Sequence, residues 1–282
     1  MQVAKKVSII NLKSRVGKST LTANLAWYFA AVRPKPVKVL VVDLDPQFNA
    51  SQYLLGLNEY EKILTQGQLT TWNILEQNTS TLTAKTGIPD PHQLIHNVVT
   101  FVNDTRIDLI LSRLELAFSQ RNPSQKERHL SNILAELENE YDLILIDCAS
   151  SESVLTKAAY LASDYLLVPV KLEYLCTIGL PPLIDSLNNF KNDYNDHDLN
   201  LAGLVFNSTS YAFPEAIYSK AVVRQIADEN RWYVFNAEVP YSRALATNAQ
   251  EGRAIIPTPY DSTTQKEQFM KFTNEFAARI GL

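Results

Sequence analysis

Cysteine is scarce in this 282-residue chain, which contains only Cys148 and Cys176. The two lie in unrelated contexts, with no CxxC pair and no clustered histidines, so the usual spacing of a zinc site is absent. We therefore expect two reduced, buried thiols, as is usual for proteins of a reducing compartment.

Long apolar runs and an excess of positive charge are also missing. No run of about 18 apolar residues occurs, which argues against a membrane-spanning helix. The first predicted strand begins within a few residues of Met1, which leaves no room for a secretory signal. The net charge of −4 argues against a protein that coats nucleic acid through its overall charge. These absences predict a cytoplasmic protein with no membrane partner.

Apolar and charged residues are present in ordinary globular proportions, 46% and 20%, so the chain can bury a core. Short runs that are apolar on both faces predict strands of a parallel sheet covered on both sides: residues 7–11, 37–43, 107–111, 141–147, 164–170 and 199–207. Amphipathic stretches between them predict helices at residues 19–32, 125–140, 178–194 and 214–229. This alternation predicts a doubly wound, mainly parallel α/β sheet with helices on both faces, where ligands bind at the carboxyl ends of the strands.

The alternation predicts a single domain over residues 1–282, because α/β folds of about 250 residues often form one unit. Residues 57–92 are richer in Gln, Thr and Asn and predict a partly irregular insertion over the sheet edge. Residues 261–282 predict a closing amphipathic helix. Its basic residues, Lys271 and Arg279, are too few for a membrane-binding face, so we expect it to pack in the core.

The most specific motif is LKSRVGKST, residues 12–20, between the first predicted strand and the first predicted helix. In this position, backbone N–H groups and a helix N-terminus can point at phosphates. Lys18 would reach the β- and γ-phosphates, Ser19 would offer its hydroxyl to Mg²⁺, and Gly17 would let the backbone approach closely. The triplet GKS is common by chance, so its strand–loop–helix context carries the prediction. The alternative is an ordinary turn between a strand and a helix.

Three aspartates lie at the carboxyl ends of predicted strands, beside this loop. Asp43 and Asp45 lie at the end of the second strand and should both face the loop, where two carboxylates could hold the hydration shell of Mg²⁺ and orient an attacking water. An Asp before Pro is also common in solvated turns, so both interpretations stay open. Asp147 follows four consecutive apolar residues, as a Walker B aspartate does, and would bind Mg²⁺ through water. The alternative for Asp147 is an exposed residue at a strand end.

Five segments follow one another in a characteristic order: INLKSRVGKSTLTANLA, VLVVDLDPQFNAS, YDLILIDCA, YLLVPVKLE and VPYSRALATNAQEGRAI. Their series resembles the ParA/MinD family of partition and positioning ATPases along nearly the whole chain. The resemblance implies that Lys13 is the signature lysine, which crosses a dimer interface to the partner's nucleotide. It implies that Lys18 is the loop lysine and that Asp45 positions water, with Asp43 as its support at the metal.

The same resemblance implies the remaining site residues. Asn207 matches a position that contacts adenine, and Pro240 lies where the late loop of the nucleotide site begins. The implied Mg²⁺ residues are Ser19, Asp43 and Asp147. The implied nucleotide contacts are Arg15, Val16, Gly17, Lys18, Ser19, Thr20, Asn207 and Pro240.

The family's activity implies a homodimer, formed through ATP and Mg²⁺, that hydrolyses ATP slowly and positions DNA or another cargo. A stimulating partner or cargo adaptor would trigger release. Relatives carry basic residues in the last third that bind DNA non-specifically, which would place the dimer on the nucleoid. The candidates here are Lys220, Arg224, Arg231, Arg243 and Arg253. The alternative is a set of scattered, solvated basic residues in an acidic protein.

The chain departs from the family at Ser14 and Arg15, where the family has two glycines. If either position needs a positive φ, a non-glycine residue costs about 1–2 kcal/mol. The protein could then be a nucleotide-binding scaffold that cannot hydrolyse ATP, Arg15 could act as an intrinsic arginine finger, or the sequence could be an altered one. Residues 148–152 (CASSE) also stand where the family usually has prolines. An iron–sulfur reductase of the same superfamily is a rival, but Cys148 is expected to be buried rather than placed to share a cluster.

Overall fold

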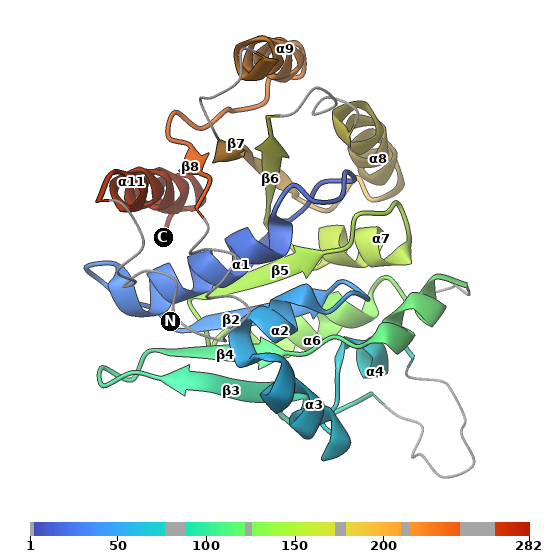
Figure 1. The fold of residues 1–282 in the computed structure, drawn as a ribbon. Coiled ribbons are helices and arrows are strands. Elements are labelled where there is room, and N and C mark those ends of the chain that lie inside the picture. Colours follow the sequence, from blue (N-terminus) through green and yellow to red (C-terminus); the bar gives the residue numbers. More distant parts are fainter. Residues whose placement is uncertain (1–2, 77–87, 122–125, 173–178, 210–214, 243–262) are drawn as a thin grey trace.

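The computed structural model describes residues 3–76, 88–121, 126–172, 179–209, 215–242 and 263–282. Its strands form one sheet in the order β3-β4-β2-β5-β1-β6-β7-β8 (Figure 1). Neighbouring strands are parallel, except that β3 runs antiparallel to β4. The strands are β1 Lys5–Ile9, β2 Val39–Leu44, β3 Ile95–Thr100, β4 Arg106–Ile110, β5 Leu143–Cys148, β6 Tyr165–Lys171, β7 Asn200–Thr209 and β8 Val239–Pro240. The prediction of a mainly parallel α/β sheet is confirmed.

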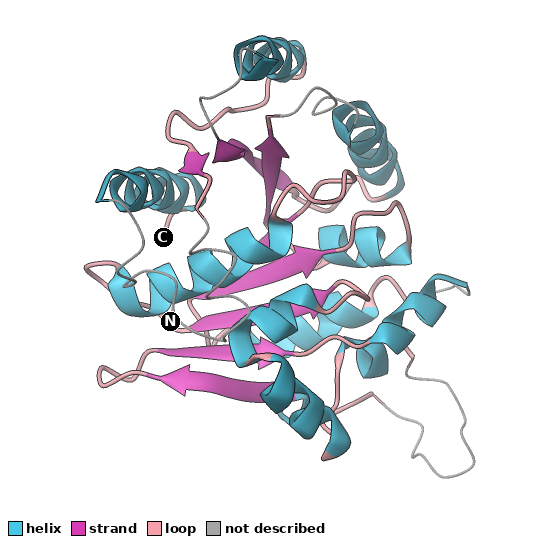
Figure 2. Ribbon diagram, in the orientation of Figure 1, coloured by secondary structure: helices cyan, strands magenta, loops and turns pink. Residues whose placement is uncertain are grey.

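Helices cover both faces of this sheet (Figure 2). The α-helices are α1 Lys18–Trp27, α2 Asn49–Leu55, α3 Leu57–Thr65, α4 Thr71–Leu75, α5 Pro91–Leu94, α6 His129–Leu137, α7 Val154–Leu161, α8 Leu180–Asp193, α9 Glu215–Glu229 and α11 Thr263–Ile280. A π-helix, η1 Tyr28–Val32, and a 3₁₀ helix, η2 Leu114–Arg121, complete the set in the described part of the chain.

The alternation of side chains along each central strand explains the two layers. In β2, Leu40 and Val42 belong to the core cluster formed with α6, α7 and α8, whereas Val39 and Val41 belong to the cluster formed with α1, α3 and α11. Successive side chains of a strand point to opposite faces, so an uninterrupted apolar run requires cover on both sides.

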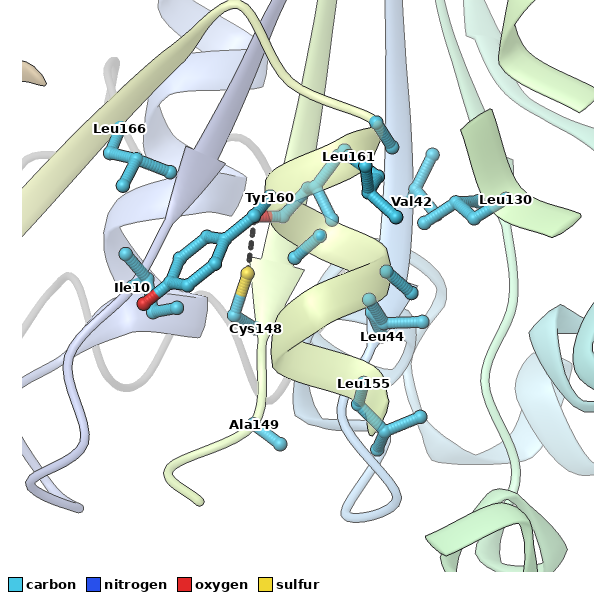
Figure 3. Close-up of a cluster of buried hydrophobic side chains, with 14 of the residues drawn as sticks. Ile10, Val42, Leu44, Leu130, Cys148, Ala149, Leu155, Tyr160, Leu161 and Leu166 are labelled. Atoms are coloured by element: carbon cyan, nitrogen blue, oxygen red, sulfur yellow. Dashed lines mark hydrogen bonds between the residues drawn. The ribbon is translucent and has the colours of Figure 1, made fainter. Parts of the chain in front are cut away.

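The thiol of Cys148 lies in the first of these clusters. Figure 3 shows it between Ile10 and Tyr160 on one side and Leu155 of α7 on the other. The side chain is 2% exposed, and burial raises the pKa of the thiol to about 12. The prediction that Cys148 is buried is confirmed, and Cys176 lies outside the described residues.

The C-terminal helix packs as the sequence predicts. Phe272 and Phe276 of α11 are fully buried, with ring centroids 5.1 Å from Phe235 and 6.0 Å from Phe29, respectively. The apolar face of α11 is therefore part of the core, which confirms the prediction for the chain's end.

Several boundaries and elements differ from the sequence prediction. The helix expected to continue to residue 32 is α-helical only to Trp27 and then widens into η1. The stretch 57–92 contains the short helices α3 and α4 and the start of α5, which the sequence did not predict, and its residues 77–87 lie outside the described ranges. Strands β3 and β8 were also missed. In β3 every side chain is half-buried or exposed, so it lacks the apolar run on which strand prediction depends.

Candidate nucleotide-binding site

The loop between β1 and α1 lies at the carboxyl ends of the central strands. Asp147 at the end of β5 is in register with Ile9 of β1 and with Asp43 of β2. A cleft of about 810 Å³ opens beside them, lined by the loop and the first turn of α1, by residues 45–47 after β2, and by residues 149–151 after β5. Three predicted motifs, far apart in the sequence, thus meet at one edge of the sheet, where doubly wound folds bind ligands.

Gly17 gives the loop its close packing. Its φ is 85°, and a Cβ at this position would lie 2.5 Å from Nδ2 of Asn207. That nitrogen donates a hydrogen bond to the carbonyl oxygen of Val16 at 2.7 Å. Glycine is required here for both reasons, because a side chain would be strained and would displace Asn207.

Arg15 also has a left-handed backbone, with a φ of 61°, whereas Ser14 does not. Of the two positions where the family has glycine, only residue 15 therefore carries the predicted strain. A non-glycine residue in this region costs about 1–2 kcal/mol. The side chain of Arg15 is exposed and lines the cleft.

Lys18 points along the inside of the loop and is 6% exposed. Its Nζ donates to the carbonyl oxygen of Asn11 at 3.2 Å and to Oγ of Ser150. Burial lowers the pKa of Lys18, and the nearby carboxylates of Asp147 and Asp45 oppose that shift. The lysine is thus held at the cleft by groups that a phosphate could replace.

Lys13 occupies a different side of the loop. It is half-buried and is not among the residues that line the cleft. Its backbone N–H donates to Oδ1 of Asn11 at 2.9 Å, and Gly179, the residue before α8, packs so closely that a Cβ there would lie 2.8 Å from Cβ of Lys13. Lys13 therefore does not contribute to the cleft of its own chain.

Asp147 has one carboxylate oxygen without a protein partner. The side chain is fully buried. Oδ1 accepts a hydrogen bond from Oγ1 of Thr22 at 3.4 Å, whereas Oδ2 accepts none. Burial and the neighbouring carboxylate of Asp43 raise the pKa of Asp147 well above its usual value. An unpaired buried carboxylate oxygen is costly unless a cation or ordered water meets it, so the site fits a hydrated Mg²⁺.

The other two aspartates differ from each other. Asp45 lines the cleft and is 9% exposed, and burial raises its pKa. Asp43 does not line the cleft. Its carboxylate accepts hydrogen bonds from the backbone amide of Ser51 at 2.8 Å and from the hydroxyl of Ser51 at 2.7 Å. It also accepts one from the backbone amide of Asp45 at 3.1 Å. We expected both carboxylates to face the loop; of the two, only Asp45 lines the cleft. Burial raises the pKa of Asp43 to about 7.

A second, smaller cavity of about 90 Å³ lies on the other side of Gly17, between α1, Asn207 and the residues that flank Pro240. Asn24 of α1 also lines it, and the Oδ1 atom of Asn24 is buried without a hydrogen-bond partner. Asn24 was not predicted from the sequence. The signal was a polar residue on the otherwise buried face of the first helix.

The basic candidates for DNA are only partly available in the described structure. Lys220 pairs with Glu238 at 2.5 Å, and both Lys220 and Arg224 pack over the ring of Phe206. Arg224 and Arg231 are exposed. Arg243 and Arg253 lie outside the described residues.

In the described ranges, no group of three or more His, Cys, Asp or Glu residues could hold a metal ion by itself. No described helix is both long and apolar enough to cross a membrane.

The sheet, the loop and its lysine define this chain as a P-loop nucleoside triphosphatase. The family described as "AAA domain" matches residues 4–200. A relative, the chromosome-partitioning ATPase Soj of Treponema pallidum, is 30% identical over 280 residues, which cover 99% of each chain. The chain belongs to the ParA/MinD family of ATPases.

Solved structures agree with this fold. A Cyanothece McdA variant bound to ATP matches with a TM-score of 0.78 at 15% identity, over 100% of this chain and 98% of the other. Cobyrinic acid a,c-diamide synthase from Mycobacterium smegmatis, with a bound ATP analogue and magnesium, matches with a TM-score of 0.65 at 21% identity, over 88% and 92%. At these identities the likeness shows the fold.

Proposed function

We propose that this chain is a single-domain, dimeric ATP switch that hydrolyses ATP slowly and positions DNA or another cargo in the cell. One observation carries the proposal: buried Lys18 and the carboxylate of Asp45 line one cleft, and Asp147, whose Oδ2 has no hydrogen-bond partner, is buried close enough to Lys18 to affect its pKa. A buried cation and two carboxylates around a glycine-containing loop suit a nucleotide with a hydrated Mg²⁺. The partitioning relative and the ATP-bound structures support the choice of nucleotide and role.

Each residue of the site receives a role from its place. Lys18 would exchange its contact with Ser150 for the β- and γ-phosphates. Ser19 would offer its hydroxyl to Mg²⁺, with Asp147 meeting the ion through water. Bound Mg²⁺ would neutralise charge on the phosphates. Asp45, the cleft-lining carboxylate of the second strand, would orient the attacking water.

The base would occupy the smaller cavity beside Asn207 and Pro240. The amide nitrogen of Asn207 already bonds to the loop, and its oxygen would accept a hydrogen bond from the base. The partly unsatisfied amide of Asn24 supports a polar ligand in this cavity.

Dimerisation through the nucleotide is supported by the position of Lys13. Lys13 does not line the cleft of its own chain, which agrees with a role at the nucleotide of a partner. The two cleft-bearing faces would then meet across ATP, and hydrolysis, stimulated by a partner or cargo adaptor, would separate them.

Non-specific DNA is the proposed surface for the ATP dimer, which would place the protein on the nucleoid in the cytoplasm. Arg224 and Arg231 support this proposal through their exposure. A single copy offers few phosphate contacts, so binding would require both copies and would weaken steeply with salt. The proposed contacts are Lys220, Arg224, Arg231, Arg243 and Arg253.

A second candidate is a nucleotide-binding scaffold that does not turn over. The strained backbone and exposed side chain of Arg15 at the cleft favour it. Phosphate release with and without Mg²⁺ separates the two functions, because only the switch releases phosphate.

The site assignment is tested by Lys18→Ala. Calorimetry should detect no ATP binding in this variant, because Lys18 is the cation assigned to the β- and γ-phosphates. The control is Lys62→Ala, which removes an exposed lysine paired with Glu59 on α3. Size-exclusion chromatography of the parent with ATP, ADP and no nucleotide then reports the dimer. Unchanged ATP affinity in a folded Lys18→Ala protein contradicts the assignment.

A further inference from the structure

One carboxylate holds both ends of the turn that carries Asp45. Oδ1 of Asp43 accepts the amide N–H of Asp45 at 3.1 Å, before the turn, and Oδ2 accepts the amide N–H of Ser51 at 2.8 Å, after it. Inside the turn, the amide of Phe48 donates to the carbonyl oxygen of Asp45 at 2.8 Å. The path of residues 45–48 is therefore set from the buried end of β2.

This arrangement also supplies the missing cap of α2. The N-cap residue, Phe48, offers no side-chain hydrogen bond to the first turn. First-turn amides have no partner within their own helix. The carboxylate of Asp43 meets one of them from the neighbouring strand, and a negative charge is favourable at a helix N-terminus. The start of α2 is thus tied to the same carboxylate as Asp45.

The hydroxyl of Ser51 adds two hydrogen bonds to this arrangement. It donates to Oδ2 of Asp43 at 2.7 Å and accepts the amide N–H of Ser112, beyond β4, at 3.1 Å. Ser51 is fully buried. A single hydroxyl therefore joins β2, α2 and the segment after β4.

A second contact holds the turn from the side of α3. Phe48 has a φ of 45°, which is an outlier for a bulky residue. Its ring stacks on Tyr60 with centroids 5.0 Å apart and planes 7° from parallel. The hydroxyl of Tyr60 donates to the carbonyl oxygen of Ser112 at 3.0 Å. Ser112 therefore contacts Ser51 through its amide and Tyr60 through its carbonyl oxygen. The strained turn is held at Ser51 by these hydrogen bonds and at Phe48 by the ring of Tyr60.

We infer that Ser51 is a positioning residue for ATP hydrolysis, because its hydroxyl and Asp43 together fix the turn that presents Asp45 to the cleft. The inference rests on the proposed function. Neither Ser51 nor Asp43 lines the cleft, so the effect passes through Asp45. Misplacement of a reacting group by about 1 Å can cost on the order of 100-fold in rate.

The test compares Ser51→Ala, Ser51→Thr and Ser163→Ala by steady-state phosphate release. Ser51→Ala should lower kcat at least about tenfold and change the KM for ATP less than about twofold, because the phosphate contacts are untouched. Ser51→Thr keeps the hydroxyl and should recover most of kcat. Ser163→Ala removes another buried hydroxyl, which donates to the carbonyl oxygen of Ala159 at 2.8 Å, and should leave kcat unchanged.

Hydrogen exchange of the nucleotide-free proteins gives a readout that does not require turnover. The amides of Asp45 and Ser51 should exchange faster in Ser51→Ala than in the parent and in Ser163→Ala. If the parent releases no phosphate, the hydrolytic part of the proposed function fails, and hydrogen exchange still decides whether Ser51 holds the turn.

Three results overturn the inference: parent kcat in Ser51→Ala, an equal loss in Ser163→Ala, or unchanged exchange at both amides. If Ser51→Ala does not fold, Tyr60→Phe removes only the hydroxyl that donates to Ser112 and keeps the stack on Phe48. Its kcat should fall about threefold with an unchanged KM, and parent kcat in that variant likewise overturns the inference.

Discussion

The substitution Arg15→Gly is expected to stabilise the nucleotide-free protein, because it removes the backbone strain at a residue that lines the cleft. Arg15 has a φ of 61°, which costs a non-glycine residue about 1–2 kcal/mol. Arg15→Gly removes this cost, but glycine adds conformational freedom to the unfolded chain, worth about 0.4–1 kcal/mol in the opposite direction. The net gain in the free energy of unfolding should be about 0.5–1 kcal/mol, a rise of roughly 1–4 °C in Tm.

Companion variants separate strain from side-chain effects. Arg15→Ala keeps Cβ and hence the strain, so it should not gain stability. Arg15→Asn should show part of the gain in the free energy of unfolding expected for Arg15→Gly, because asparagine tolerates the left-handed region better than most residues. Ser14→Gly is the matched control. Its backbone is not left-handed, so it should gain nothing and should lose about 0.4–1 kcal/mol.

The same variants give the functional effect of the guanidinium group. If the exposed side chain obstructs closure of the dimer, Arg15→Gly and Arg15→Ala should both raise the ATP-dependent dimer fraction and turnover. If Arg15 stabilises charge in the transition state, both variants should lower turnover and leave the dimer intact. We expect obstruction, because Arg15 makes no described contact that would orient it towards a phosphate.

Urea denaturation, size-exclusion chromatography and phosphate release at saturating ATP measure the three quantities. Equal stability of Arg15→Gly and Arg15→Ala would refute the strain argument. No change in dimer fraction or turnover in either variant would show that the loop tolerates the arginine. Arg15 would then give no reason to propose a nucleotide-binding scaffold that does not hydrolyse ATP.

Three further predictions concern other parts of the site. Asp45→Ala should bind ATP but accumulate as a dimer, because the carboxylate that orients the attacking water is lost. Turnover at the parent rate would show that another residue orients this water. Burial raises the pKa of Asp43 to about 7 and that of Asp147 well above its usual value, so the folded state binds protons more tightly than the unfolded state. The free energy of unfolding without nucleotide should therefore rise as the pH falls from about 7 towards 5, and Asp147→Asn should flatten this dependence in urea titrations at several pH values. In a Cys176→Ser background, Cys148 should react with a thiol reagent at pH 8 only after unfolding, because burial raises its pKa to about 12; rapid reaction in the native protein would contradict the described core.

The sequence by itself determined the fold class and the location of the candidate site. Apolar residues on both faces of 39–42 require cover on both sides of a sheet, and this follows from the period of a strand alone. The GKS triplet between a strand and a helix located the phosphate loop, and Asp147 after an apolar run located its acidic neighbour. These are local patterns, so they can be recognised without a structure.

Only the tertiary structure decided how the site is arranged. The need for glycine at 17 comes from Asn207, 190 positions further along the chain, and the positive φ of Arg15 comes from a loop conformation that no local pattern encodes. The sequence placed Asp43 and Asp45 together. In the structure, the amide and hydroxyl of Ser51 donate to the carboxylate of Asp43, whereas the carboxylate of Asp45 lines the cleft. Which of two neighbouring acids is available for chemistry is thus set by hydrogen bonds between elements, because a buried carboxylate takes the orientation in which its oxygens are satisfied.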